Sequence, residues 1–251
     1  MLFRSGVPFD EIKIDSIGLN HLSWVRGIEA SGVDVTDGVI EAFAGLVGKQ
    51  AANDDEPGWT PDVVRLIRAI PNYYLLYYYE TARMLAYQSG TPTRASQVMD
   101  IEADLMRRYE DEGLVTKPPE LMLRGGAYYS DSAAELMADI HNDAGTVHVV
   151  NVQTRGAVPG INHDVVMEIP ARIGRKGAEA LPTREMRPDL DALVRTVKDF
   201  ELQTIAAAVD ADEDAALRAL VTNPLGPDLS QVRPLWRRLR EENAGLLGAL
   251  S

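Results

Sequence analysis

Two stretches near the start of the chain alternate polar and apolar residues in the way that half-buried strands do. The first covers residues 11–17 and the second covers residues 22–28, and the turn between them carries Gly18-Leu19-Asn20-His21. Two later stretches, 147–152 and 165–173, give the same signal and flank a Pro-Gly turn. This turn chemistry is typical of an antiparallel pair of strands.

Apolar residues at spacings of three and four predict helices over most of the remaining chain. The second of these helices has Thr60 as its expected N-cap and Pro61 at its first position. An acidic segment with a Pro-Gly turn, residues 51–58, precedes this helix and is expected to be an exposed loop. The expected helices cover residues 39–47, 63–70, 73–87, 95–110, 133–140, 190–207, 213–222 and 231–247.

These elements predict an α+β fold, in which a helix-rich domain packs on a small, mostly antiparallel sheet. No expected strand is followed by a Gly-x-Gly-x-x-Gly turn and a helix, so the sequence carries no dinucleotide-binding fingerprint. There are no internal repeats or low-complexity tracts that would divide the chain. We therefore expect one domain over residues 1–251.

The composition is that of an acidic protein with enough apolar residues for a packed core. Hydrophobic residues make up 45% of the 251, and 38 acidic against 25 basic side chains give a formal net charge of −13. Such a surface repels nucleic acid and anionic membranes, so neither is an expected partner. Without cysteine, disulfides and cysteine-ligated zinc are impossible within the chain. With no secretory signal and no apolar run long enough to span a bilayer, we expect a cytoplasmic protein.

His21 lies at a strand junction, where folds commonly place functional groups. A neutral imidazole there could bind a divalent metal, or it could simply be satisfied by backbone hydrogen bonds. A lone histidine is not a metal site, and the neighbouring sequence offers no second ligand at a suitable spacing.

Six of the nine tyrosines lie between Tyr73 and Tyr87. On a helix, Tyr74, Tyr77 and Tyr78 would share one face. A phenol has an ordinary pKa of about 10 and becomes a usable base only where a cation or a metal lowers that pKa. The alternative is an amphipathic wall whose rings are packed and whose hydroxyls lie at the water boundary.

Arg94 and Arg124 stand at junctions between loops and helices. Arg94 opens an expected helix, and a guanidinium at a helix N-terminus suits a phosphate. Arg124 precedes Gly125 and Gly126, which would let the backbone approach a ligand closely. Surface arginines are common, so the alternative is that both residues are ordinary solvated side chains.

Several short motifs occur in one order along nearly the whole chain. They are Gly18-Leu19-Asn20-His21-Leu22-Ser23-Trp24, Tyr74-Leu75-Leu76-Tyr77-Tyr78, Thr93-Arg94-Ala95, Arg124-Gly125-Gly126-Ala127-Tyr128-Tyr129-Ser130, Val150-Asn151-Val152, Gly156-Ala157-Val158-Pro159 and Asn223-Pro224-Leu225. In this order they resemble glycoside hydrolase family four, whose members use NAD and a divalent metal. Each motif is weak by itself, whereas the ordered set is specific. The tyrosine-rich and Arg-Gly-Gly motifs resemble the 6-phospho-β-glucosidase branch of the family.

The resemblance implies that a 6-phospho-β-glucoside is cleaved by oxidation, elimination, addition and reduction, with NAD and a divalent metal, typically manganese, as cofactors. It implies that Tyr74 is the catalytic base, with Tyr77 and Tyr78 as fallback choices, and that His21 is a metal ligand. The residues that the resemblance assigns to substrate binding are Asn20, Arg94 and Arg124.

Members of this family begin with a Rossmann domain that holds NAD and carries a cysteine, the other protein ligand of the metal. This sequence has neither, so it resembles the C-terminal domain only, which is also related in architecture to the C-terminal domain of lactate and malate dehydrogenases. We expect that the chain alone neither binds NAD nor hydrolyses a glycoside. Members are dimers or tetramers, so a homo-oligomer is expected. The alternative is a non-catalytic remnant that binds phosphosugars or dimerises.

Overall fold

Antiparallel hairpins form the sheet, as the alternating segments predict. The computed structural model describes residues 7–8, 11–51, 57–124 and 129–246. Within them the strands are β1 (Ile12–Leu19), β2 (Leu22–Ala30), β3 (Val33–Asp34), β4 (Ile70–Pro71), β5 (Val147–Gln153), β6 (Val166–Gly174) and β7 (Gly177–Ala180). The order is β3-β2-β1-β6-β5, with β4 added to β2 and β7 to β6, and every described pairing is antiparallel. Gly18 in β1 pairs with Glu168 in β6, which joins the two main hairpins.

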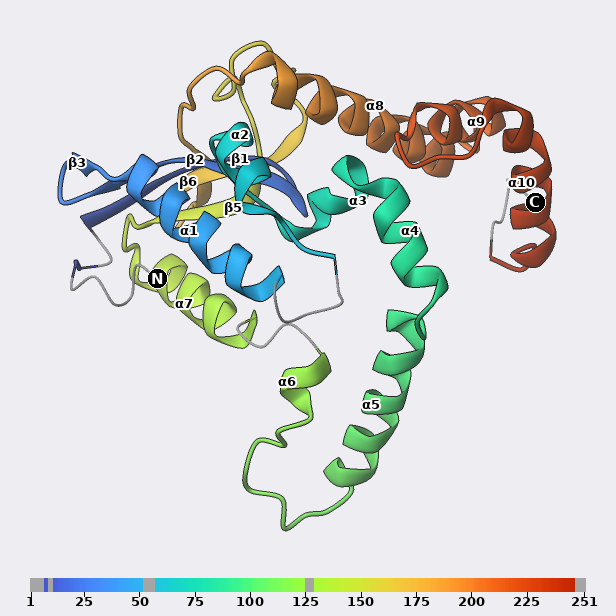
Figure 1. Cartoon of the computed structure of the whole chain (residues 1–251), viewed down its shortest axis with the longest axis horizontal. Helices are drawn as coiled ribbons and strands as arrows, with labels where there is room; N and C mark the ends of the chain where they lie inside the picture. Colours follow the sequence, from blue (N-terminus) through green and yellow to red (C-terminus); the bar gives the residue numbers. More distant parts are fainter. Residues whose placement is uncertain (1–6, 9–10, 52–56, 125–128, 247–251) are drawn as a thin grey trace.

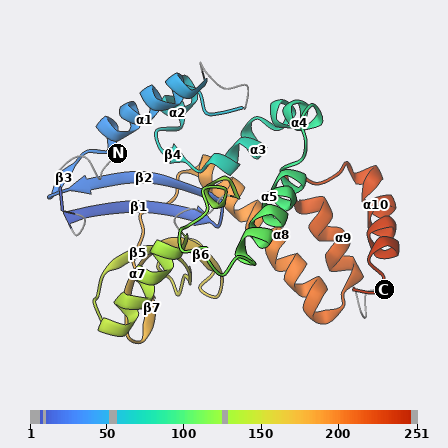
Figure 2. The ribbon, with the colours of Figure 1, turned by 90° about the horizontal axis from the view of Figure 1, so that it is seen from below.

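Helices pack on the sheet and also extend well beyond it (Figure 1). They are α1 (Thr36–Ala51), α2 (Pro61–Ile67), the 3-10 helix η3 (Tyr73–Leu75), α3 (Leu76–Tyr79), α4 (Thr81–Ser89), α5 (Arg94–Tyr109), α6 (Leu121–Arg124), α7 (Tyr129–Asn142), α8 (Pro188–Asp210), α9 (Glu213–Thr222) and α10 (Leu229–Glu242). Helix α1 contacts β2 and α7 contacts β6. By contrast, α4 and α5 lead away from the sheet, and α8 leads to α9 and α10 at the far end (Figures 1 and 2). The predicted α+β class is confirmed.

The tyrosine-rich segment is not one helix, contrary to the prediction for residues 73–87. It is divided into η3, α3 and α4, and the backbone leaves the helical region at Glu80, with φ −127° and ψ 34°. Aromatic side chains lose rotamer freedom in a helix, so a run of tyrosines gives little local support to a continuous one. The break lets Leu75 and Leu76 on one side, and Met84 on the other, reach the core.

Several predicted boundaries also need correction. Helix α7 begins four residues earlier than predicted, and α10 begins at Leu229 and ends at Glu242 instead of covering residues 231–247. Strands β3, β4 and β7 and helix α6 were not predicted, because elements of two to four residues are too short to show a hydrophobic period. Residues 125–128 of the predicted glycine loop, and residues 52–56 of the predicted acidic loop, lie outside the described part.

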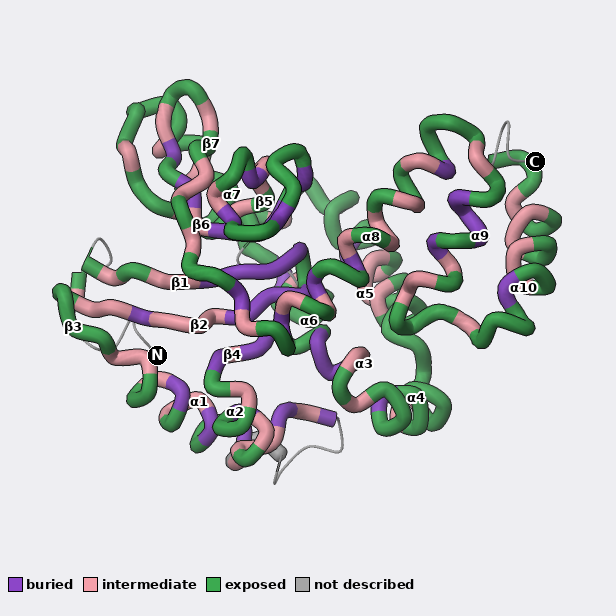
Figure 3. Tube along the Cα trace, turned by 90° about the horizontal axis from the view of Figure 1, so that it is seen from above, coloured by how far each residue is buried: buried purple, intermediate pink, exposed green. Residues whose placement is uncertain are grey.

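The main core lies between the sheet and the helices packed on it (purple in Figure 3). Its largest fully buried side chains include Trp24, Ile17, Leu75, Ile169 and Leu190. A second, much smaller cluster lies at the far end of α8, and consists of Ala207, Ala215 and Ala216 with Trp236 packed against it. None of the described helices combines the length and the apolar character needed to cross a bilayer.

Candidate functional site

His21 stands at the tip of the β1–β2 hairpin in a backbone conformation that side-chain-bearing residues seldom adopt. Leu19 pairs with Leu22, so Asn20 and His21 form a two-residue turn, and His21 has a φ of 65°. Histidine visits this left-handed region more readily than most residues, but backbone strain there still costs roughly 1–2 kcal/mol. Strain of this kind is concentrated at functional sites. Both turn residues are exposed, so their side chains are accessible.

The short strand β4 brings Tyr74 to His21. The strand pairs with β2, and the Asn72 amide donates a hydrogen bond of 2.9 Å to the Ser23 carbonyl. The Asn72 side chain then caps η3 by accepting from the Tyr74 amide at 3.0 Å. The rings of His21 and Tyr74 therefore stack, with centroids 4.4 Å apart and planes 12° apart. The residues expected to be metal ligand and base thus meet, although they are far apart in the sequence.

The stack of rings continues from Tyr74 to Tyr77. The centroids of these two rings are 6.3 Å apart and their planes differ by 13°. The Tyr77 hydroxyl accepts a hydrogen bond of 3.1 Å from the side-chain amide of Gln88, and this bond orients the Tyr77 ring. Tyr74 is held between His21 and Tyr77 while 44% of its surface remains exposed. A packed ring with an accessible surface is consistent with both alternatives, a catalytic base and part of an amphipathic wall.

The next two tyrosines are less suited to act as bases. Burial raises the pKa of Tyr78, and the negative charge of Glu201 raises it further. Burial also raises the pKa of Tyr79, with Asp189 adding to the effect. A raised pKa keeps the hydroxyl protonated near neutral pH, so it removes protons poorly. Among the tyrosines of the segment, Tyr74 alone stacks directly on His21.

The two candidate phosphate ligands lie together on a different part of the fold. Arg94 opens α5, and its Nη2 donates to the Leu123 carbonyl at 2.6 Å. Arg124 closes α6 and forms an ion pair of 2.6 Å with Glu102. Both arginines are exposed. Helix α4 lies between the tyrosine segment and the start of α5 along the chain (Figure 1). A phosphate at Arg124 would compete with Glu102.

The described residues do not by themselves fit a tightly held metal. Among them there is no group of three His, Cys, Asp or Glu side chains placed to hold an ion. Stacking on Tyr74 uses the face of the His21 ring, so its nitrogens, which lie in the ring plane, are free to coordinate. A catalytic metal needs several protein ligands, and His21 supplies one. Likewise, the antiparallel pairings described contain no β-α-β unit of the kind that binds NAD.

Ser23 and Asn72 support the site, although neither of them was given a role from the sequence alone. Asn72 follows Pro71 and comes immediately before the tyrosines, and an asparagine before a helix is a common N-cap. That signal could have found Asn72. Ser23 is a buried serine within a strand and carries no such signal.

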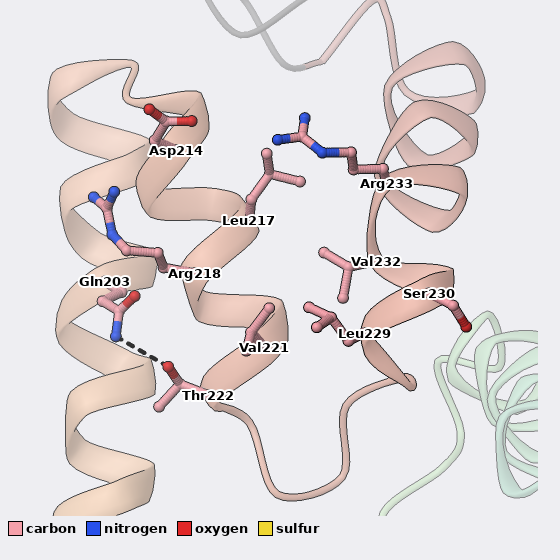
Figure 4. A pocket seen from close by; sticks show the side chains of 10 residues that line it. All are labelled: Gln203, Asp214, Leu217, Arg218, Val221, Thr222, Leu229, Ser230, Val232 and Arg233. Carbon is pink, nitrogen blue, oxygen red and sulfur yellow. Dashed lines mark hydrogen bonds between the residues drawn. The ribbon is translucent and has the colours of Figure 1, made fainter.

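A hollow of about 520 Å³ lies between α8, α9 and α10 and includes none of the candidate residues (Figure 4). Its apolar lining comes from Leu217 and Val221 in α9 and from Leu229 and Val232 in α10. Leu229 is 75% exposed, so the hollow is an open gap in the packing of these helices.

Comparison with known protein families first identifies the class of protein to which the chain belongs. Residues 16–226 match the family model described as the Family 4 glycosyl hydrolase C-terminal domain. The chain therefore belongs to this family, and the resemblance found in its sequence is confirmed.

Comparison with individual proteins shows which members of the family the chain is similar to. The chain is 34% identical over 234 residues to 6-phospho-beta-glucosidase BglT of Thermotoga maritima, a match covering 93% of this chain and 55% of BglT. It is 32% identical over 246 residues to a probable 6-phospho-beta-glucosidase of Bacillus subtilis, covering 96% and 56%. A structure of the Thermotoga maritima 6-phospho-beta glucosidase with manganese, NAD+ and glucose-6-phosphate matches with a TM-score of 0.85 at 30% identity, again covering 96% and 56%. The chain thus spans about half the length of these relatives.

Proposed function

We propose that this chain is the C-terminal part of a 6-phospho-β-glucosidase, which cleaves 6-phospho-β-glucosides by NAD-dependent oxidation, elimination, addition and reduction. The observation that carries the proposal is the stack of His21 on Tyr74 at 4.4 Å. The family resemblance assigns His21 to metal binding and Tyr74 to proton removal, and these roles require the two side chains to be neighbours. The relatives named as 6-phospho-beta-glucosidases, at 32–34% identity, support the choice of substrate.

The proposed roles are those that the family resemblance implies, and the stacking of His21 on Tyr74 supports two of them. Tyr74, as a phenolate, accepts the proton from carbon two of the sugar on its phenolic oxygen, and His21 offers one ring nitrogen to a divalent metal. Asn20, beside His21 in the exposed turn, contacts the sugar. Arg94 binds the sugar phosphate, and Arg124 supports it from the same α5–α6 contact.

In the whole protein, NAD would supply the redox chemistry and a divalent metal, expected to be manganese, would stabilise negative charge on the sugar oxygens. The described residues contribute only His21 to that metal and no nucleotide site. We therefore propose that the remaining ligands and the NAD site come from a further polypeptide segment, and that this chain by itself is inactive.

Exposed apolar side chains support association with a partner. Met99 and Met106 on α5 are 68% and 63% exposed, and Ile205 and Val209 on α8 are 57% and 76% exposed. Such surfaces are typical of protein interfaces, so we propose a homo-oligomer, a dimer or a tetramer. The same surfaces favour the second candidate function, a non-catalytic remnant that dimerises or binds phosphosugars. Because NAD and sugar phosphates are intracellular metabolites, we propose a cytoplasmic location for either function.

The deciding experiment measures release of p-nitrophenol from p-nitrophenyl 6-phospho-β-glucoside in the presence of NAD, Mn²⁺ and a reductant. The chain is assayed alone and mixed with the part of the Thermotoga maritima relative that lies outside the match. We expect turnover only on mixing. Turnover by the chain alone would contradict the proposed inactivity. If the two parts associate without turnover, while the chain binds glucose-6-phosphate in calorimetry, the remnant is the better account.

Substitutions separate the roles within the active mixture. We expect Tyr74→Phe to lower kcat by about 10²–10⁴-fold, the usual contribution of a general base. Tyr109→Phe is the matched control, because Tyr109 has a similar exposure of 48% and lies on α5, outside the ring stack. We expect His21→Ala to abolish the turnover that depends on Mn²⁺. His141→Ala, at the end of α7, is its control. If a variant and its control lose equal activity, the role assigned to that residue is wrong.

A further inference from the structure

A hydrogen bond between Ser23 and Glu168 crosses the sheet close to the hairpin tip. Ser23 in β2 and Glu168 in β6 both pair with Gly18 in β1, so the three residues form one row across three strands. Because Gly18 has no side chain, Ser23 Oγ can donate to Glu168 Oε1, at 2.7 Å. Ser23 is only 7% exposed and Glu168 is half-buried. A charge-assisted hydrogen bond in such a place is strong and directional.

Ser23 is also linked to both halves of the candidate site. It follows His21 by two positions, after the turn has closed. Its carbonyl accepts from the Asn72 amide at 2.9 Å, and Asn72 in turn caps the Tyr74 amide. A movement of Ser23 would therefore displace His21 through the chain and Tyr74 through Asn72.

We propose that Glu168 and Ser23 are positioning residues that set the stacking of His21 on Tyr74. Glu168 holds the Ser23 side chain from the neighbouring hairpin, and Ser23 holds the turn and the start of η3. The proposal rests on the proposed function, in which a metal ligand and a base must keep a fixed separation for proton removal. Groups that orient reacting side chains contribute through geometry, so small displacements reduce the rate of the reaction.

The same hairpin contains a matched pair at its opposite end. Ser31 Oγ donates to Glu11 Oε2 at 2.5 Å, just beyond the far ends of β2 and β1. This contact has the same chemistry, but both residues are exposed and remote from the tip in the strand register. It supplies a control for the loss of a serine–glutamate hydrogen bond on these strands.

The test is proton NMR of the four histidine rings in the chain as it exists. The face of the Tyr74 ring shields protons stacked on it, so the His21 signals should lie upfield of those of His141, His148 and His163. We expect Ser23→Ala and Glu168→Ala each to remove most of this upfield shift, and the double variant to remove no more than either single variant. Glu168→Gln, which keeps an acceptor oxygen, should restore most of the shift. Ser31→Ala should leave it unchanged.

Unchanged His148 and His163 signals will show that each variant is folded. An unaltered His21 shift in both alanine variants, or an equal change in Ser31→Ala, would overturn the positioning role. In the active mixture, Ser23→Ala should lower kcat and leave KM nearly unchanged. If the mixture has no turnover while the NMR shifts change as expected, the proposed function fails and the positioning role of Ser23 and Glu168 stands. If the mixture turns over but the NMR shifts do not change, only the positioning role is wrong.

Discussion

The sheet end that carries His21 and the far end of the α8–α10 helices are stabilised in opposite ways. Beneath the hairpin tip, Ile17, Leu19, Leu22 and Trp24 are at most 3% exposed, and they belong to the main core. At the far end of α8 the buried cluster consists of alanines, and Val209 is 76% exposed. An exposed histidine with a strained backbone persists only where surrounding packing determines its position. In the described residues, the far end of α8 has only the small alanine cluster for support, so packing holds it less firmly than the sheet end.

Removing a tryptophan from each region gives the largest expected contrast. Trp24→Ala should lower the free energy of unfolding by about 3–5 kcal/mol, because a large, fully buried side chain leaves a cavity. Trp236→Ala should cost only about 1 kcal/mol, since this half-buried ring packs on small alanines and its indole donates to Glu213. Urea unfolding followed by circular dichroism measures both. Equal losses would mean that the two regions are equally well packed.

Two glycines at opposite ends of the β1–β2 hairpin sharpen the contrast within the supported region. A Cβ on Gly18 would lie 2.1 Å from the Leu22 carbonyl oxygen, whereas one on Gly32 would meet nothing within 4 Å. Gly18→Ala should therefore cost about 2–4 kcal/mol, from backbone strain and overpacking together. Gly32→Ala, at φ +80°, should cost about 1 kcal/mol from strain alone. The midpoints of thermal unfolding test this order, and a larger loss at Gly32 would contradict it.

The fold class followed from the sequence because long elements show their period. Helix α8 and strand β6 bury residues at the spacing that their sequences predict, whereas β1 and β2 bury consecutive residues near the hairpin tip. The tyrosine-rich segment was mispredicted, because its break serves tertiary packing of Leu75 and Met84 and leaves no local trace. Strand β4 has only two residues, yet it decides where Tyr74 lies.

The candidate site was predictable residue by residue but not as an arrangement. Motif order suggested His21 and Tyr74, whereas their stacking depends on Asn72, which donates to the distant Ser23 carbonyl and accepts from the Tyr74 amide. Arg94 and Arg124 were expected to bind phosphate, and whether they do remains a prediction. Their contacts to Leu123 and Glu102 come from the fold of α5 against α6, which no local pattern indicates.

Acid should weaken the far end of α8 by a small, local effect at the start of α9. The Asp212 side chain caps α9 by accepting from the Ala215 amide at 3.0 Å. This bond, with help from the positive charge of Arg218, lowers the pKa of Asp212 below its ordinary 3.8. The pKa of Asp212 is lower in the folded state than in the unfolded state. The ionised cap therefore contributes its full stabilisation above about pH 3.8, and this stabilisation is lost as the pH falls through the folded-state pKa.

Asp212→Asn should remove this dependence, since an asparagine oxygen can still accept from Ala215 but does not titrate. The protection of α9 amides against hydrogen exchange, taken relative to the intrinsic exchange rate at each pH, should fall more between pH 5 and pH 3 in the original protein than in the variant. Asp228→Asn is the control, because Asp228 precedes α10 without forming a side-chain cap. If the two variants respond alike, the acid sensitivity comes from another group, and the far end of α8 owes little to this cap.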